Sequence, residues 1–127
     1  MKIYVCHSRS FDFEKELYSL LKKFFSSRGN EIIFPHDEKH KNINTTDIIK
    51  SCDLILAECS FPSTGLGIEL GRAEVFKKRV ICLVREDIKE SSSLHFITNE
   101  FIRYKDKVDL INKLGRLINY ECKINIY

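Results

Sequence analysis

The sequence predicts one α/β domain over residues 1–127, built on a doubly wound, mainly parallel sheet of five strands. Short apolar runs alternate with segments of helical periodicity, and the connections between them are short. The runs are apolar throughout and do not alternate with polar residues, which is typical of parallel strands covered on both faces. A chain of 127 residues suits one such core. The pattern is that of flavodoxin-like and Rossmann-like folds.

Five segments rich in aliphatic residues are expected to form the strands: residues 3–6, 32–34, 54–57, 80–84 and, more weakly, 101–102. Four segments have helical spacing: residues 13–25, 47–51, about 67–77 and 108–118. Gly29 is expected to stop the first helix, and Ser10 or Asp12 to cap its start. Thr45 or Thr46 is expected to cap the second helix. Residues 37–46 and 86–93 are polar and predict loops.

The composition is that of an ordinary globular protein, with 43% hydrophobic and 31% charged residues. A net charge of +3 is too small to indicate nucleic acid as a partner. No apolar run reaches the ~18 residues of a membrane span, and the N-terminus has no signal-peptide pattern. The five cysteines lack metal-ligand spacing, so we expect reduced core thiols at Cys6, Cys52, Cys59, Cys82 and Cys122. We expect a cytoplasmic protein without metal or cofactor.

Ligands of doubly wound folds bind outside the carboxyl ends of the strands, where the sheet changes direction. The loops that follow Cys6, Phe34 and Cys59 are expected to meet there. The third of these loops carries the most informative segment of the chain, PSTGLGIELGRA at residues 62–73. A binding site is therefore predicted at this edge.

Gly65 and Gly67 let the backbone approach a ligand and present N–H groups at the predicted start of a helix, which is a ready anion site. Ser63 and Thr64 add hydroxyl donors. Glu69 is expected in the first helical turn, where the helix dipole favours the ionised carboxylate that a nucleophile needs. A purely structural reading is equally compatible with this spacing, because Gly-containing turns and acids at helix starts are common. The third glycine of a dinucleotide-binding fingerprint is absent.

The run LILAECSFPSTGLGIELGRAEVFKKRVICLVRE, residues 54–86, resembles the core of the nucleoside 2-deoxyribosyltransferase superfamily. It is most similar to the 2'-deoxynucleoside 5'-phosphate N-hydrolases of that superfamily, whose core reads AExxxPSxGxGxELGRA followed by NKRxxCLxR. The opening IYVCHS, residues 3–8, resembles the family's first strand and the Gly-Ser-x-Arg loop that follows it. The resemblance is strong in the middle of the chain and weak at both ends.

The resemblance implies that Glu69 attacks C1' of a (deoxy)nucleoside 5'-monophosphate and expels the base. A covalent glutamyl-sugar intermediate is then resolved by water or, in transferases, by a second base, by the logic of retaining glycosidases. Tyr4 matches a first-strand tyrosine that holds this glutamate through a hydrogen bond. A half-buried strand aromatic would explain Tyr4 equally well.

The resemblance also implies a phosphate site. Ser8, Ser63 and Gly65 match positions that hold the 5'-phosphate, and Gly67 belongs to the same turn. Ser93 matches a serine that reaches the phosphate from a neighbouring subunit. The expected assembly is therefore a homodimer or an assembly of dimers, and the two-fold dimer is also the commonest assembly of soluble proteins. A solvated polar loop would explain Ser93 as well.

Two departures from the family concern the loops. The family's phosphate-binding arginine falls at Ser10, whereas this chain has Arg9, so a shift of one residue is required. The loop from His36 to Thr46 is much shorter than in the hydrolases, and it helps to form the base pocket there. His36 ends the second strand and is a candidate for the site, although a loop histidine without a catalytic role is the commoner case.

A third departure concerns the catalytic acid. The family carries an aspartate eight residues before the one that opens the third strand, and counting back from Asp53 gives Thr45. Asp47 is the nearest acid and Asp37 is a second candidate. An acid at the start of a helix explains Asp47 better than catalysis does.

Two other functions compete with N-hydrolysis of nucleotides. The opening IYVCHSRSFDFEKEL, residues 3–17, resembles TIR domains, which use a helical glutamate to break the N-glycosidic bond of NAD. A nucleotide-binding sensor that has lost catalysis would explain the missing aspartate at position 45. The 62–73 block favours the deoxyribosyltransferase group over both.

Overall fold

The computed structural model has one sheet of five parallel strands in the order β2-β1-β3-β4-β5. The structure describes residues 1–36 and 43–126, with side chains up to residue 118. The strands are β1 (Lys2–His7), β2 (Glu31–Ile33), β3 (Leu54–Glu58), β4 (Arg79–Arg85) and β5 (Phe101–Tyr104). All five predicted strands are confirmed, as is the doubly wound α/β fold. The chain runs outward on both sides of β1, so the switch point lies at the carboxyl ends of β1 and β3.

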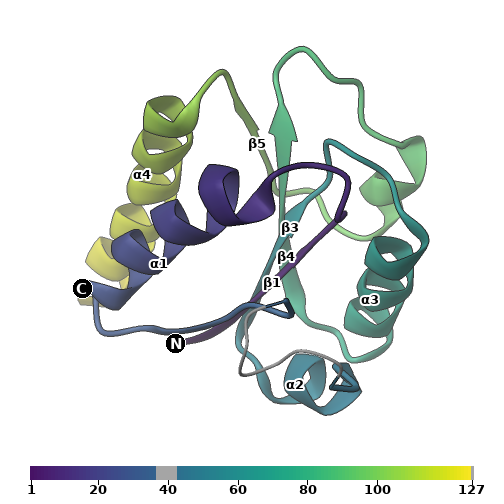
Figure 1. Ribbon diagram of the computed structural model, residues 1–127. Coiled ribbons are helices and arrows are strands. Elements are labelled where there is room, and N and C mark those ends of the chain that lie inside the picture. The colour runs from purple at the N-terminus through teal and green to yellow at the C-terminus, as the bar shows by residue number, and fades with distance from the viewer. Residues whose placement is uncertain (37–42, 127) are drawn as a thin grey trace.

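Helices cover both faces of the sheet (Figure 1). Helices α1 (Ser19–Ser26) and α4 (Lys107–Ile126) lie on one face, and α2 (Thr46–Ser51) and α3 (Thr64–Val75) lie on the other. A π-helical turn, η1 (Glu14–Tyr18), leads into α1. The predicted loop 86–93 ends in a 3-10 turn, η2 (Ser92–Phe96), which buries Leu94.

Alternation of the strand side chains divides the core into two layers. One layer packs under α1 and α4 and includes Ile3, Val5, Leu54, Leu56, Ile81 and Leu83. The other packs under α2 and α3 and includes Tyr4, Cys6, Ile55, Ala57, Val80 and Cys82. Because both faces are covered, the strands are apolar throughout, as the sequence predicted. Cys6, Cys52, Cys59 and Cys82 are buried free thiols, as expected.

Local signals explain the helix ends and correct two expectations. Gly29 ends the first helical segment with a φ of 74°. Thr45 occupies the N-cap position of α2, as expected, but its side chain makes no capping hydrogen bond; the Asn44 side chain accepts instead from the Thr46 N–H at 3.0 Å. Helix α3 begins at Thr64, not near Gly67, because the Ser63 hydroxyl caps it by accepting from the Leu66 N–H at 3.2 Å.

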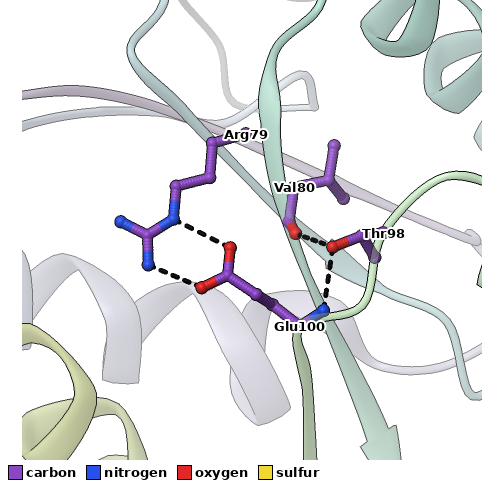
Figure 2. A network of polar contacts seen from close by, with 4 residues as sticks. All are labelled: Arg79, Val80, Thr98 and Glu100. Carbon is purple, nitrogen blue, oxygen red and sulfur yellow. Dashed lines mark hydrogen bonds and ion pairs between the residues drawn. The ribbon is translucent and has the colours of Figure 1, made fainter.

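Polar contacts hold the start of β5 beside the start of β4, at the amino ends of the strands (Figure 2). The Arg79 guanidinium donates to both carboxylate oxygens of Glu100, at 2.9 and 2.7 Å. The Thr98 hydroxyl donates to the carbonyl of Val80 at 2.6 Å and accepts from the Glu100 N–H at 3.0 Å. These contacts join the start of β5 to the start of β4, at the edge opposite the predicted site.

Candidate active site

A cavity of about 590 Å³ lies at the carboxyl edge of the sheet, on the side of α2 and α3. Its walls come from the loop after β1, the turn after β2, the residues that precede α2 and the middle of α3. The lining residues are Arg9, Phe13, Glu14, Pro35, His36, Ile43, Asn44, Thr45, Glu69 and Arg72. Three of the predicted site residues, namely Arg9, His36 and Glu69, therefore share one cavity.

Glu69 lies in the second turn of α3, so its expected place in the first turn is wrong: no acid occupies the first turn of this helix. The helix starts earlier than predicted because Ser63 caps it. Burial raises the pKa of the Glu69 carboxyl, and the nearby Tyr4 hydroxyl and Arg72 guanidinium offset part of this shift. The side chain is half-buried, and its Oε2 is buried without a hydrogen-bond partner among the described residues.

Tyr4 lies on β1 beneath this carboxylate and is fully buried. Its hydroxyl also lacks a hydrogen-bond partner within the described part of the chain. Burial raises the pKa of Tyr4 far above its usual range, the Glu69 carboxylate adds to the rise, and the Thr45 hydroxyl offsets a small part. The two groups lie close enough for the Tyr4 hydroxyl to lower the pKa of Glu69, yet neither the Tyr4 hydroxyl oxygen nor Glu69 Oε2 has a partner within hydrogen-bond distance among the described residues. Such orphaned groups are rare in folded proteins and are typical of sites that a ligand completes.

The candidates for the family's catalytic aspartate differ in where they lie. Thr45, at the position of the family's aspartate, lines the cavity beside Glu69. Asp47 is exposed in the first turn of α2 and does not line the cavity, as the helix-start explanation predicted. Asp37 lies outside the described residues. The described part of the cavity therefore has a hydroxyl where the family has a carboxylate.

The loop after β1 contributes Arg9 to the cavity wall, whereas Ser10 does not line the cavity and its hydroxyl contacts the Ser8 hydroxyl at 2.8 Å. The one-residue shift required by the sequence is therefore compatible with the structure. Ser8 is buried, with only 3% of its surface exposed. The predicted phosphate ligands Ser8 and Ser10 thus hydrogen-bond each other in this structure.

His36 packs against a group of rings at the cavity wall. Its ring centroid lies 5.3 Å from that of His7 and 5.5 Å from that of Phe13. Burial lowers the pKa of His36, and the charge of Arg9 lowers it further. Burial also lowers the pKa of His7 to about 4, so this ring is neutral near pH 7. Its Nδ1–H donates to the Ser8 carbonyl at 2.7 Å, which leaves Nε2 to accept from the Tyr18 hydroxyl at 2.6 Å.

A second cavity, of about 560 Å³, lies between α3 and η2. Ser63, Gly67 and Ser93 of the same chain all line it. Gly65 is exposed in the first turn of α3 and lines neither cavity. A Cβ built on Gly65, Gly67 or Gly71 would meet no other atom within 4 Å. The structure therefore groups three of the predicted phosphate-site residues together and separates them from Ser8.

Sequence reasoning missed the polar residues that end four of the strands, β1, β3, β4 and β5: His7, Glu58, Arg85 and Tyr104. By alternation they all point to the α1/α4 face, opposite Tyr4. Their signal was a polar residue directly after an apolar run. Arg72 was also missed as a site residue, although it lies in the ELGRA motif.

Among the described residues, no three His, Cys, Asp or Glu side chains are grouped so as to hold a metal ion. No helix in the described range has the length and apolarity needed to cross a bilayer.

No protein-family model matches the chain. A 47-residue segment is 45% identical to the 5-hydroxymethyl-dUMP N-hydrolase of Branchiostoma floridae and covers 35% of this chain and 45% of that protein. Matches to N-hydrolases of the same name from other animals span 21% to 46% of those proteins. The chain thus matches less than half the length of its curated relatives.

Two solved structures extend the likeness to almost the whole chain. The CMP N-glycosidase of Clostridium botulinum aligns with a TM-score of 0.69 and 27% identity over 91% of this chain and 99% of that one. A 2-deoxyribosyltransferase of Bacillus psychrosaccharolyticus shares the fold, with a TM-score of 0.60 and 22% identity over 88% of this chain and 91% of that one. The resemblance of this chain to the nucleoside 2-deoxyribosyltransferase superfamily, and within it to the nucleotide N-hydrolases, is confirmed.

Proposed function

We propose that this protein is an N-glycosidase that cleaves the base–sugar bond of (deoxy)nucleoside 5'-monophosphates. The observation that carries the proposal is the Glu69–Tyr4 pair, in which a buried carboxylate oxygen and a buried hydroxyl lie together at a cavity without a partner. The likeness to nucleotide N-hydrolases and to a CMP N-glycosidase supports the same class of reaction.

In the proposed reaction, a carboxylate oxygen of Glu69 forms a bond to C1' while the N-glycosidic bond breaks and its electron pair leaves with the base. Water then attacks C1', regenerates the carboxylate and yields the free sugar phosphate. Transfer to a second base would follow the same path with a different acceptor. Tyr4 donates its hydroxyl hydrogen to the Glu69 carboxylate and orients it for attack.

The leaving base must be stabilised by a donor, and two of the polar groups that line the cavity are our candidates in place of the family's aspartate. The Thr45 hydroxyl lies near Tyr4, and His36 is held neutral at the cavity wall. A neutral imidazole donates one N–H hydrogen bond and accepts another. We propose that His36 contacts the base and that Asp47 takes no part.

The 5'-phosphate is proposed to bind at the first turn of α3, where backbone N–H groups and the Ser63 hydroxyl are available. Gly65, Gly67 and Ser93 lie around this turn, whereas Arg9 lines the other cavity and Ser8 lines neither, so these two would have to reach the phosphate from the loop after β1. Measuring kcat/KM for a nucleoside and its 5'-monophosphate tests this site. A clear preference for the monophosphate is expected; equal values would argue against a phosphate site and favour the transferases.

We further propose a homodimer, or an assembly of dimers, in which Ser93 completes the neighbour's site. Helix α3 supports an interface, because Ile68 and Val75 lie on one side of it and are 51% and 74% exposed. Light scattering at micromolar concentration should give at least twice the chain mass. In a mixture of inactive Glu69→Ala and inactive Ser93→Ala chains, activity should recover in mixed dimers. Without recovery, Ser93 acts in its own chain, where it already shares a cavity with Ser63.

One assay separates the competing functions. Release of free base is measured with nucleoside 5'-monophosphates and, in parallel, with NAD. Hydrolysis of monophosphates supports the proposal, hydrolysis of NAD alone supports a TIR-like enzyme, and binding without turnover supports a sensor. A Thr45→Asp variant adds a second test, since restoring a carboxylate beside Glu69 should raise turnover if the cavity is catalytic. The cytoplasmic location remains a prediction.

A further inference from the structure

A buried carboxylate that the proposed reaction does not use lies at the end of β3. Glu58 is only 1% exposed. Its Oε1 accepts a hydrogen bond from the Ser60 N–H at 2.6 Å, and its Oε2 accepts one from the Tyr104 hydroxyl. Burial raises the pKa of this carboxyl, and contacts with Ser60, Tyr104 and Arg85 offset part of the rise. Both oxygens of this buried acid are therefore satisfied, one by a loop and one by β5.

The loop held by Glu58 leads directly into α3. Its Cys59 N–H donates to the Leu83 carbonyl at 2.8 Å, and the Ser60 hydroxyl accepts from the Arg85 N–H at 2.8 Å. Ser60 is itself only 2% exposed. Three residues further on, Ser63 caps α3. Hydrogen bonds thus run from β5 through Glu58 to Ser60, and the short 60–63 segment of the chain connects Ser60 to the turn that starts this helix.

We propose that Glu58 is a positioning residue for the phosphate-binding turn: it fixes the 59–63 loop, and through it the first turn of α3, in the conformation that receives the 5'-phosphate. The proposal rests on the proposed function. It follows from geometry, because Ser60 and Ser63 lie on one short loop, and only the first of them has a partner deep in the sheet. Glu58 itself lines neither cavity, but its hydrogen-bond partner Ser60 lines the second one.

The test compares four variants of the full-length protein. Glu58→Leu removes both hydrogen bonds. Glu58→Gln keeps an oxygen acceptor for the Ser60 N–H, and its amide can donate to Tyr104. Tyr104→Phe removes only the contact far from the loop. Glu100→Gln is the matched control, because it weakens a paired carboxylate at the opposite edge of the sheet.

The readout is the ratio of kcat/KM for a nucleoside 5'-monophosphate to that for its nucleoside. Glu58→Leu should lower this ratio by about tenfold, mainly through a higher KM for the monophosphate, equivalent to one lost hydrogen bond of ordinary strength. Glu58→Gln and Glu100→Gln should leave it unchanged, and Tyr104→Phe should lower it by a smaller factor. A purely structural role would reduce the active fraction for both substrates equally. An unchanged ratio in folded Glu58→Leu would therefore overturn the proposal.

The test still gives an answer if Glu58→Leu does not fold or if the wild-type protein is inactive. If Glu58→Leu does not fold, Tyr104→Phe carries the test, and an unchanged ratio in that variant overturns the proposal. If the wild-type protein releases no base at all, the proposed function fails, and hydrogen exchange decides the role of Glu58 separately. The Ser60 amide should then exchange faster in Tyr104→Phe than in Glu100→Gln, and inorganic phosphate should bind more weakly. Equal exchange and equal phosphate binding in the two variants would reject the positioning role.

Discussion

Two carboxylate–tyrosine pairs lie at the carboxyl edge of the sheet, one on each face, and they differ in hydrogen bonding. Glu58 accepts from Tyr104 and from a backbone N–H, so both of its oxygens are satisfied. Glu69 and Tyr4 are also buried together, but an oxygen of each lacks a partner among the described residues. A satisfied buried network makes a structure rigid, whereas an unsatisfied one is destabilising unless a ligand completes it. We therefore propose that the first pair serves stability and positioning and that the second takes part in the reaction.

The largest effect is expected on turnover when the second pair is broken. Glu69→Gln should lower kcat by at least about 1000-fold, because an amide cannot attack C1'. Base release measured by chromatography checks this. A loss of less than about tenfold would show that Glu69 is not the nucleophile.

The first pair should respond in stability instead. Glu58→Leu leaves two buried donors unpaired, so the free energy of unfolding should fall by about 2–4 kcal/mol. Urea titration followed by circular dichroism measures this. If Glu58→Leu and Glu69→Gln destabilise the protein equally, the division of labour between the pairs is wrong.

Stability should also depend on pH differently once Glu69 is replaced. The folded state raises the pKa of Glu69 above its ordinary 4.5, so the protonated form stabilises the fold at low pH and this contribution is lost as the pH rises through the raised pKa. Glu69→Gln cannot ionise and should therefore gain stability relative to the wild type between about pH 5 and about pH 8. Urea midpoints at the two pH values provide the comparison, and Glu100→Gln, in which an exposed ion pair is weakened, serves as the control. A relative loss with rising pH would contradict the burial of this carboxylate.

A smaller effect on catalysis is expected when only the hydroxyl of the second pair is removed. Tyr4→Phe should lower kcat by about tenfold, or ~1.4 kcal/mol, because the carboxylate loses the group that orients it. Since the Tyr4 hydroxyl lowers the pKa of Glu69, the acidic limb of the pH–rate profile should move to higher pH. An unchanged pH–rate profile would show that the Tyr4 hydroxyl does not influence the ionisation of Glu69.

The smallest effect concerns the hydroxyl of the first pair. Tyr104→Phe should reduce the free energy of unfolding by about 1 kcal/mol, the usual contribution of one hydrogen bond, and should leave the pH–rate profile in place. Thermal melts and rate profiles together check it. A shifted profile would show that the two faces of the sheet are electrostatically coupled.

The strands were predictable because each is a continuous apolar run, and strands buried on both faces read that way. The start of α3 was misplaced because Gly65 and Gly67 suggested a turn, whereas the Ser63 cap outweighs the weak helix propensity of glycine. That three-residue error moved Glu69 from the first turn to the second. Burial raises the pKa of Glu69, which is the opposite of the dipole effect that the sequence led us to expect.

The candidate site was predictable only in part. Glu69, Arg9 and His36 meet in one cavity because the carboxyl ends of parallel strands share an edge. The placement of Thr45 followed from counting along the family pattern. Glu58 could not be identified, because its role depends on contacts with Ser60 on the next loop and Tyr104 on β5, which are 2 and 46 residues away in sequence. Non-local contacts of this kind leave no periodic signal.

The glycine content of helix α3 has a consequence for engineering the stability of the protein. Three of its twelve residues are glycines, and the methyl group of an alanine in their place would meet no atom within 4 Å beyond its chain neighbours and the adjacent backbone of the helix itself. Each glycine inside a helix lowers its stability by about 1 kcal/mol relative to alanine. Helix α3, which carries Glu69, is thus less stable than the space around its glycines would allow. Gly71→Ala is a thermostabilising substitution by this reasoning, and any loss of function that accompanies it marks the place where another molecule must come close to the helix backbone.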